Sequence, residues 1–279
     1  TVLVLFLLRI VSAISLPIAD CDEVYNYWEP LHYLLYGSGL QTWEYSPEFA
    51  LRSYGFLRLA AFPATWPYYL GINKVTVFYF VRIGLAILSA YAEIFFIISV
   101  RRRYGESVSG KLYYTMLASY GICVVASSAL LPNSSAMIAG MIILGLWMRN
   151  HHHAALLVSA FLVIVVSPFV AVVFVPMVID VVIKRGLPAV IVTGIKAVVF
   201  ILLPSIAVDW FYYGKLVVSA WNIVEYNAFA NEERGAELYG VEPWTYVWLI
   251  VWMYPAFLFS VLMYVCLYVY LLLLAAGTM

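Results

Sequence analysis

Three carboxylates stand within four positions near the beginning of the chain, in the stretch Asp20-Cys21-Asp22-Glu23. They follow directly on a long apolar run, so they lie where a membrane helix would leave the hydrocarbon. One interpretation is structural, because Asp and Glu at the start of a helix complement the positive end of its dipole. The other is catalytic: a carboxylate at headgroup height could be a general base where a lipid-linked phosphate meets an acceptor hydroxyl.

Two residues of the following stretch could hold substrate. Arg52 has a forked guanidinium that matches phosphate oxygens, although an interfacial arginine also reaches lipid headgroups by snorkelling. Glu44 stands between Trp43 and Tyr45, so it could bind sugar hydroxyls beside an aromatic face or belong to an aromatic belt at the membrane interface. A later group could line the same cavity or anchor the interface: Tyr239, Glu242 and Trp244.

The elements that must position these residues are membrane helices. Of the 279 residues, 65% are apolar and 11% are charged, against about 25% charged in soluble domains. A helix needs about 20 apolar residues to cross a bilayer, and five runs reach that length: residues 2–19, 75–100, 112–131, 188–208 and 244–274. Shorter stretches could be short spans, halves of a kinked helix or parts of a re-entrant hairpin: residues 133–148, 154–166 and 169–183. The sequence therefore predicts an all-α polytopic membrane protein with about eight transmembrane or membrane-embedded helices.

The basic residues indicate how these helices are oriented, because short loops rich in Lys and Arg stay on the cytoplasmic side. If turns at Pro132-Asn133 and at Ser167-Pro168 separate short helices, Arg101 to Arg103, Arg149 and Lys184 all fall on one side. A single Pro-kinked helix over residues 154–183 would instead put Arg149 and Lys184 on opposite sides of the membrane. We therefore expect two short segments there.

Two long acidic loops, residues 20–74 and 209–243, then both face the lumen. Within the first loop, residues 24–36 and 47–59 are typical of amphipathic interfacial helices, which suit a site that handles lipid substrates. Neither an internal repeat nor a linker divides the chain, so residues 1–279 are expected to form a single membrane domain.

Charge and cysteine content argue against several other classes. Fifteen Lys and Arg balance fifteen Asp and Glu, so no basic excess favours nucleic-acid binding. Of the three cysteines, Cys123 and Cys266 lie in apolar runs, and neither a disulfide framework nor a cysteine zinc site is expected with Cys21. Because the chain starts at Thr1 without Met and stops just after an apolar run, we expect both termini to be cut.

Two blocks of sequence resemble a known family. The stretch DCDEVYNYWEP at residues 20–30, with QTWEYSP at 41–47 and LRSY at 51–54, closely resembles the dolichyl-phosphate-mannose-dependent alpha-1,2-mannosyltransferases of asparagine-linked glycosylation. A second block, WFYYGKL at 210–216 with Asn222-Ile223, Tyr226-Asn227 and LYGVEPW at 238–244, is similar to a later luminal loop of the same family. The resemblance implies the GT-C membrane fold, a luminal active site and an inverting reaction that needs no metal.

The resemblance also implies roles for individual residues. The family's Asp-Glu pair falls on Asp22 and Glu23, and Asp20 takes the position of a His in relatives that mannosylate glycolipid anchors. Asp22 is the predicted base, with Asp20 and Glu23 orienting it or binding sugar. A phosphate-linked lipid is a good leaving group, so one carboxylate that takes the acceptor proton suffices. The predicted substrate-binding residues are Arg52, Glu44, Tyr45, Trp28, Glu29, Tyr239, Glu242 and Trp244.

The function implied is transfer of mannose from dolichyl phosphate mannose to a 2-hydroxyl of mannose in a dolichyl-diphosphate-linked oligosaccharide, at the luminal face of the endoplasmic-reticulum membrane. No cofactor is expected beyond the donor, and the partners are the lipid-linked donor and acceptor and membrane lipid. One alternative is a mannosyltransferase of glycosylphosphatidylinositol-anchor assembly, against which the stretch Trp43-Glu44-Tyr45-Ser46-Pro47 argues. Another is a non-enzymatic transporter or scaffold, although a transporter should carry its charges at the midplane. Family members are longer, so their C-terminal portion is expected to be absent.

Overall fold

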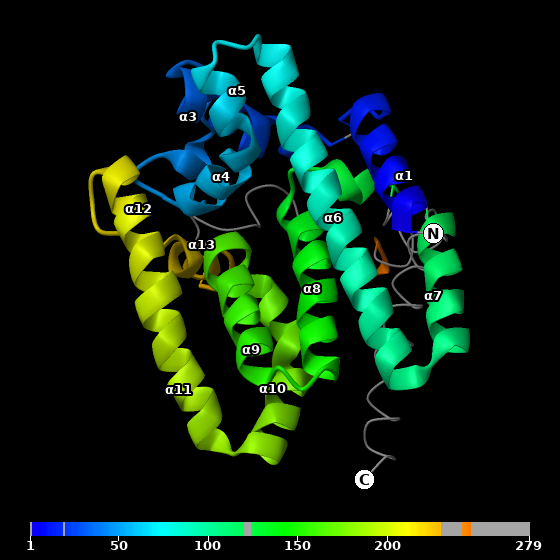
Figure 1. Ribbon diagram of the computed structural model, residues 1–279. Coiled ribbons are helices and arrows are strands. Elements are labelled where there is room, and N and C mark those ends of the chain that lie inside the picture. Colours follow the sequence, from blue (N-terminus) through cyan, green and yellow to red (C-terminus); the bar gives the residue numbers. More distant parts are fainter. Residues whose placement is uncertain (1, 19, 120–123, 230–241, 247–279) are drawn as a thin grey trace.

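The computed structural model describes residues 2–18, 20–119, 124–229 and 242–246, and throughout these residues helices and turns are the regular structure. Long helices lie side by side in a bundle (Figure 1): α1 (Val2–Ser15), α6 (Lys74–Tyr104), α7 (Glu106–Ala118), α8 (Pro132–Met148), α9 (His152–Phe161), α10 (Ala171–Arg185) and α11 (Leu187–Ala197). A π-helical turn at Val198–Leu202 joins α11 to α12 (Leu203–Tyr213). The prediction of an all-helical chain is confirmed for the described residues.

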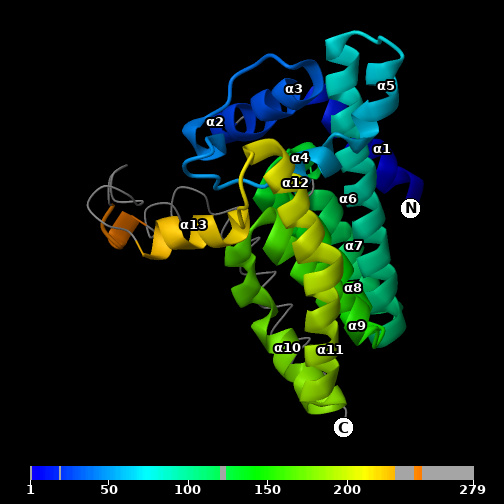
Figure 2. The same cartoon turned by 90° about the vertical axis from the view of Figure 1, so that its left-hand side faces the viewer.

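Shorter helices gather at one end of the bundle. They are α2 (Cys21–Glu23), a π-helical turn at Val24–Trp28, α3 (Glu29–Tyr36), a 3-10 turn at Trp43–Tyr45, α4 (Tyr54–Ala60), a 3-10 turn at Phe62–Ala64, α5 (Thr65–Tyr69) and α13 (Ser219–Ala228). Figure 2 shows α13 projecting sideways from this end, across the direction of α11 and α12. The opposite end carries the basic turns between α6 and α7, between α8 and α9, and between α10 and α11.

An apolar cluster holds the short helices on the bundle. Leu31 of α3 and Leu57 of α4 are almost completely buried, and they pack in one cluster with Val81 of α6, Val165 and Tyr213. Burial of one such side chain contributes about 1.5–3 kcal/mol, so this cluster fixes residues 20–74 to the helices beneath them.

Among the described residues, two helices are long and apolar enough to cross a membrane, Lys74–Tyr104 with 31 residues and Leu187–Tyr213 with 27 residues. At about 1.5 Å per residue, each exceeds the roughly 30 Å of hydrocarbon in a bilayer. The predicted helices over 75–100 and 188–208 are confirmed and extend beyond the predicted limits. The predicted span 244–274 lies almost wholly outside the described residues, and the helix number and membrane orientation stay predictions.

The predicted breaks before α8 and before α10 are confirmed, although Pro132 and Asn133 belong to the first turn of α8 and not to a loop. Pro132 begins α8, where its missing N–H costs no helical hydrogen bond. Ser167 has an extended backbone with φ −159° and ψ 118°, so α9 and α10 are separate helices and not one kinked helix. The helix predicted over 24–36 is also confirmed, although its first turn is π-helical, and it ends at Gly37 with φ 70°.

The prediction of one helix over 112–131 is wrong. α7 ends at Ala118, Ser119 is extended, and Ala126–Ser128 forms a 3-10 turn. Polar contacts connect residues 128–130, near the end of this segment, to other helices. The Leu130 N–H donates to the Glu23 carboxylate at 2.9 Å, and Arg82 donates to the Ser128 hydroxyl at 3.2 Å.

The prediction of a helix over 47–59 is wrong in its first half. Helix α4 begins at Tyr54, where the Ser53 hydroxyl caps it by accepting a hydrogen bond from the Gly55 N–H at 3.0 Å. Before it, Ala50 has a φ of 45°, which an α-helix does not allow. The first helix is also shorter than predicted, since α1 ends at Ser15.

Arg9 and Glu93 form an ion pair in the bundle, between α1 and α6. Arg9 donates from Nε and Nη2 to the two carboxylate oxygens at 2.9 and 2.8 Å, and both side chains are fully buried. Ser89 donates a further hydrogen bond to the same carboxylate at 3.2 Å. Ionisable groups inside apolar helices are tolerated when they are paired in this way.

Candidate active site

A cavity of about 480 Å³ opens where the short helices meet the bundle. Six segments that are far apart in the sequence contribute to its wall: Asp20 and Asp22, Trp43–Tyr45, Leu51–Ser53, Leu131–Asn133, Ile164–Phe169, and several residues from Ser219 to Asn227. The wall combines carboxylates and Arg52 with apolar side chains.

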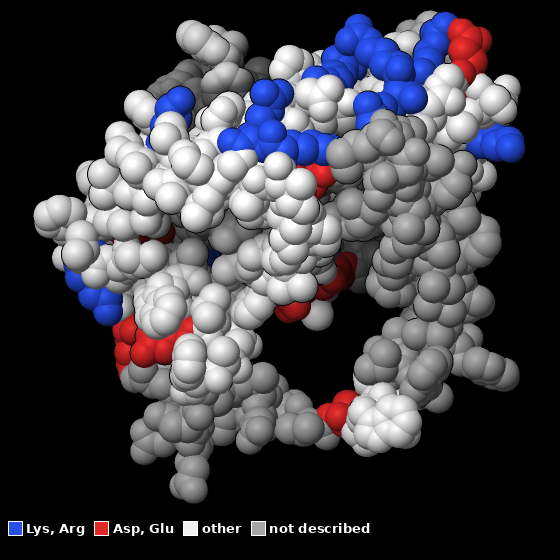
Figure 3. All heavy atoms as spheres, turned by 90° about the horizontal axis from the view of Figure 1, so that it is seen from below, with Lys and Arg blue, Asp and Glu red and all other residues white. Residues whose placement is uncertain are grey.

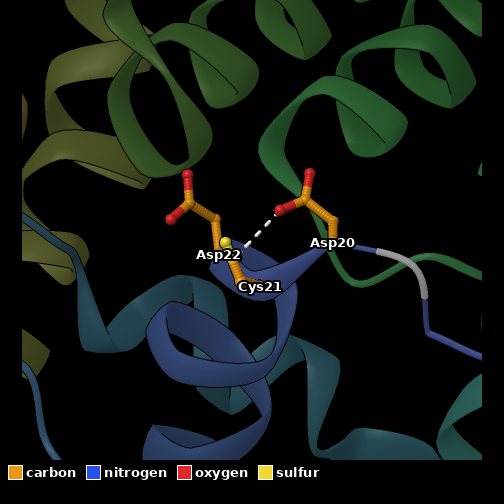
Figure 4. A group of neighbouring side chains, drawn as sticks. All are labelled: Asp20, Cys21 and Asp22. Carbon is orange, nitrogen blue, oxygen red and sulfur yellow. Dashed lines mark hydrogen bonds between the residues drawn. The ribbon is translucent and has the colours of Figure 1, made fainter.

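Asp20 and Asp22 lie at the edge of this cavity, and their exposed carboxylates project to the same side of α2 (Figure 4). Asp20 is the N-cap of α2, because its Oδ1 accepts a hydrogen bond from the Asp22 N–H at 2.8 Å. The structural interpretation of the acidic stretch therefore holds for Asp20. Asp22 takes part in the cap through its backbone only, so its carboxylate is available to a bound hydroxyl.

Glu23 points away from the cavity. It is 4% exposed and accepts hydrogen bonds from the Leu130 N–H and the Trp28 indole N–H, each at 2.9 Å. Trp28 also packs on Phe78, with ring centroids 4.5 Å apart. Glu29 accepts from the Leu40 N–H at 3.0 Å. Among the predicted site residues, Glu23, Trp28 and Glu29 therefore do not line the cavity, and their geometry favours positioning roles.

Arg52 and Glu44 form a two-pronged ion pair in the wall. Arg52 donates from Nε and Nη2 to the Glu44 carboxylate at 2.8 and 3.2 Å, and from Nη1 to the Tyr27 hydroxyl at 2.7 Å. Its guanidinium has five N–H groups, so two remain for a ligand. Tyr45 also lines the cavity, and its hydroxyl donates to the Asn26 carbonyl at 2.8 Å.

The charge state of this pair follows from its surroundings. Burial alone would lower the pKa of Arg52. The hydrogen bonds that Arg52 donates to Glu44, and its electrostatic interactions with Tyr27 and with the Glu44 carboxylate, raise that pKa above the usual value. Burial raises the pKa of Tyr27 as well. Arg52 is therefore a permanent cation in the cavity wall, and Tyr27 is a neutral hydroxyl beside it.

Asp209 joins the two blocks of sequence and was not among the predicted site residues. Its buried carboxylate accepts hydrogen bonds from the Tyr54 N–H at 2.8 Å, the Ser53 hydroxyl at 3.0 Å and the Ser219 hydroxyl at 2.8 Å. The adjoining Tyr213 donates to the Arg52 carbonyl at 2.6 Å. The sequence contains a signal for this contact, because Asp209 directly follows an apolar run and a carboxylate at such a position needs partners.

The second block contributes to the cavity through α13. There Tyr226 packs against Trp43 with ring centroids 5.4 Å apart. The predicted residues of this block lie elsewhere. Glu242 and Trp244 are exposed and do not line the cavity, and Tyr239 lies outside the described residues. Their roles in substrate binding stay predictions.

One group of described residues could hold a metal ion. Asp20, Cys21 and Asp22 present ligand atoms that all lie within 4.8 Å of one another (Figure 4). Carboxylate oxygens of this kind suit Mg²⁺ or Mn²⁺. Exposed carboxylates also stand together without a metal, so the group is compatible with a metal and with a metal-free base.

The sequence resemblance implies a transfer reaction, and we predict that such activity would survive exhaustive chelation. A lipid phosphate next to a permanent guanidinium needs less help from a metal than a nucleotide diphosphate does. Turnover should be measured after EDTA treatment, with and without added Mg²⁺ or Mn²⁺. Loss of turnover with rescue by one of these ions would assign Asp20 and Asp22 as metal ligands.

The long apolar helices, and the cavity with carboxylates and Arg52 at one end of them, define the class of protein. It is a helical protein of membrane type with a polar site at the end of its helices. Within that class, the chain belongs to the Alg9-like mannosyltransferase family, which it matches over residues 1–279.

Curated relatives agree with this assignment. The chain is 40% identical to human alpha-1,2-mannosyltransferase ALG9 over 244 residues, which cover 87% of this chain and 39% of the human protein. It is 39% identical to the protein of that name from Schizosaccharomyces pombe, over 87% of this chain and 44% of the relative. It is 31% identical to the protein of that name from Saccharomyces cerevisiae, over 88% of this chain and 46% of the relative. The chain thus spans less than half the length of these relatives. No solved structure matches it.

Proposed function

We propose that this chain transfers mannose from dolichyl phosphate mannose to a 2-hydroxyl of a mannose in a dolichyl-diphosphate-linked oligosaccharide. The observation that carries the proposal is that the Asp22 carboxylate and the Arg52 guanidinium line one cavity at the end of apolar helices. A base and a phosphate-binding cation are the two groups that such a transfer needs. Family membership and the names of the relatives point to the same reaction.

The proposed reaction assigns roles to the charged residues of the cavity. The acceptor hydroxyl oxygen attacks C1 of the donor mannose while its proton moves to Asp22. The bond from C1 to the phosphate oxygen breaks, and dolichyl phosphate leaves with the electron pair, so the configuration at C1 inverts. The two free N–H groups of Arg52 bind the phosphate and stabilise the charge that develops on it. Glu44 keeps Arg52 in place.

The apolar residues of the cavity wall suit the lipid part of the donor. Leu131, Ile164, Val165, Val166 and Phe169 line the cavity together with the charged residues. A polyprenyl chain that enters between the helices would bring its phosphate to Arg52 without exposing apolar surface to water. The aromatic ring of Trp43, beside Glu44, offers a face for the sugar.

An assay with defined acceptors tests this function. The chain in liposomes should transfer radiolabelled mannose from dolichyl phosphate mannose to a dolichyl-diphosphate oligosaccharide, and an alpha-1,2-mannosidase should release the label. Transfer to a glycosylphosphatidylinositol precursor instead would support the alternative acceptor. Uptake of donor lipid or sugar without any transfer would support a transporter and contradict the proposal.

We also propose that the cavity faces the lumen of the endoplasmic reticulum, with the basic turns in the cytoplasm. Glycosylation acceptor sites inserted near Gly37 and near Gly235 should then both be modified. A site inserted at Gly186, in the turn between α10 and α11 at the opposite end of the bundle, should stay unmodified. Modification at Gly186, or at only one of the other two positions, would contradict this orientation.

A further inference from the structure

A second cavity, of about 290 Å³, lies at the opposite end of the bundle. It is bounded by the end of α6 and the turn between α8 and α9, and it is lined by Arg102, Arg103, Met148, Arg149 and His151. Figure 3 shows that Lys and Arg side chains gather on this face of the molecule. Because α8 has 17 residues, the two ends are separated by roughly 25 Å, so this cavity is not part of the proposed active site.

The positive charge of this cavity is not neutralised within the part of the chain that the structure describes. No carboxylate lines it, and neither Arg102 nor Arg103 forms an ion pair with a described residue. Basic residues beside the cavity differ in this respect. Arg101 pairs with Glu106, and Lys184 pairs with Asp180 at 2.9 Å. The three guanidiniums that line the cavity thus have no carboxylate partner among the described residues.

Arg149 is held in a fixed orientation. Its Nε donates to the Ser99 hydroxyl at 2.8 Å, and its guanidinium lies over the Phe95 ring, 4.2 Å from the centroid. Gly145 makes room for that ring, because a Cβ at this position would come within 2.6 Å of Phe95 Cε1. The Nη1 group makes no hydrogen bond with a described residue, so it remains for a ligand.

The turn that carries His151 also has a fixed conformation. Asn150 has a φ of 62°, and the His151 N–H donates back to the Leu146 carbonyl at 2.9 Å. Three guanidiniums and an imidazole are therefore gathered at one cavity, in part by an ordered turn. Guanidinium forks match the oxygens of a phosphate group.

We propose that this cavity binds the phosphate of an anionic phospholipid headgroup, in the leaflet that surrounds this end of α6. The position supports a lipid, because α6 is long and apolar enough to cross a membrane and Arg102 and Arg103 lie in its last turn. Met148 supplies apolar wall next to the charges, which suits the glycerol and the start of an acyl chain. Basic pockets at the ends of membrane helices bind anionic headgroups in this manner.

The test uses the purified full chain in neutral detergent, titrated with phosphatidylinositol 4-phosphate and, separately, with phosphatidylcholine, and followed by native mass spectrometry. The chain should retain the anionic lipid in preference to the neutral one. The double variant Arg102→Gln, Arg103→Gln should bind about 25-fold more weakly, since each basic residue near a lipid surface contributes about fivefold in affinity. Both side chains are exposed, so their replacement leaves the fold intact.

The matched control is Arg101→Gln, Arg185→Gln, which removes the same charge from the same end of the molecule but not from the cavity. This control should bind almost as well as the unmodified chain. Arg149→Lys should weaken binding although the charge is kept, because the lysine lacks the planar fork. An equal loss in the two double variants would assign binding to general surface charge and overturn the site. Inorganic phosphate that binds as tightly as the lipid would overturn the lipid assignment.

Discussion

Asp22→Asn should abolish mannose transfer while the protein stays folded and still binds its donor. The amide keeps the size of the side chain but cannot take the proton of the acceptor hydroxyl. The Asp22 carboxylate is exposed and only its backbone N–H takes part in the cap of α2, so the substitution breaks no described structural contact of the side chain. General-base catalysis contributes about 10²- to 10⁴-fold, and turnover should fall by that range. Single-turnover transfer and donor retention should be measured on the same preparation.

Asp20→Asn is the matched control, because asparagine caps a helix about as well as aspartate. This variant should keep the α2 turn and most of its turnover. Glu23→Gln should also cost less than Asp22→Asn, since a carbonyl oxygen can still accept from the Leu130 N–H. An Asp22→Asn protein with more than about a tenth of normal turnover would be outside the expected range and would move the base to a neighbouring carboxylate. A variant that unfolds would favour a structural role for the acidic stretch.

Asp209→Ala should lower the free energy of unfolding by about 3 kcal/mol, because it leaves three buried donors without an acceptor. The Tyr54 N–H is the most affected of these, since a backbone group cannot turn away to find another partner. The carboxylate also attaches the residues before α4 to α12 and α13, so Arg52 should become less well positioned. Chemical denaturation in detergent measures the stability, and donor affinity measures the position of Arg52.

Ser219→Ala is the control for this prediction. It removes one hydrogen bond but leaves the Asp209 carboxylate with its other two donors. The expected loss of stability is about 1 kcal/mol. If Asp209→Ala destabilised the protein no more than Ser219→Ala, the carboxylate would not be the connection between the two blocks.

The long apolar helices could be predicted because their signal is local. Long apolar runs correctly predicted α6 and the helix from Leu187 to Tyr213. The end of α3 at Gly37 is equally local, since it needs only a residue that adopts a positive φ. The break in the predicted helix 112–131 is not local. Near its C-terminal end, the non-helical Leu130 N–H donates to Glu23, which is 107 positions away.

The candidate site could be predicted in part for the same reason. Motif positions placed Asp22, Glu44 and Arg52 together, and the structure brings them to one cavity. The inward direction of Glu23 could not be read from a helical pattern. The turn from Val24 to Trp28 is π-helical, and its wider period changes which side chains share a face with those before it. The role of Asp209 depends on tertiary contacts with residues more than 150 positions earlier.

The buried pair between Arg9 and Glu93 has a consequence for the order in which the chain enters a membrane during synthesis. On its own, α1 carries an arginine that costs about 2.5–3.5 kcal/mol at the centre of a bilayer. Its partner carboxylate leaves the ribosome 84 residues later, on α6. We therefore expect α1 to insert stably only after α6 has entered the membrane. Glu93→Leu would then reduce the fraction of newly made chains whose first helix is integrated, before any effect on catalysis is measured.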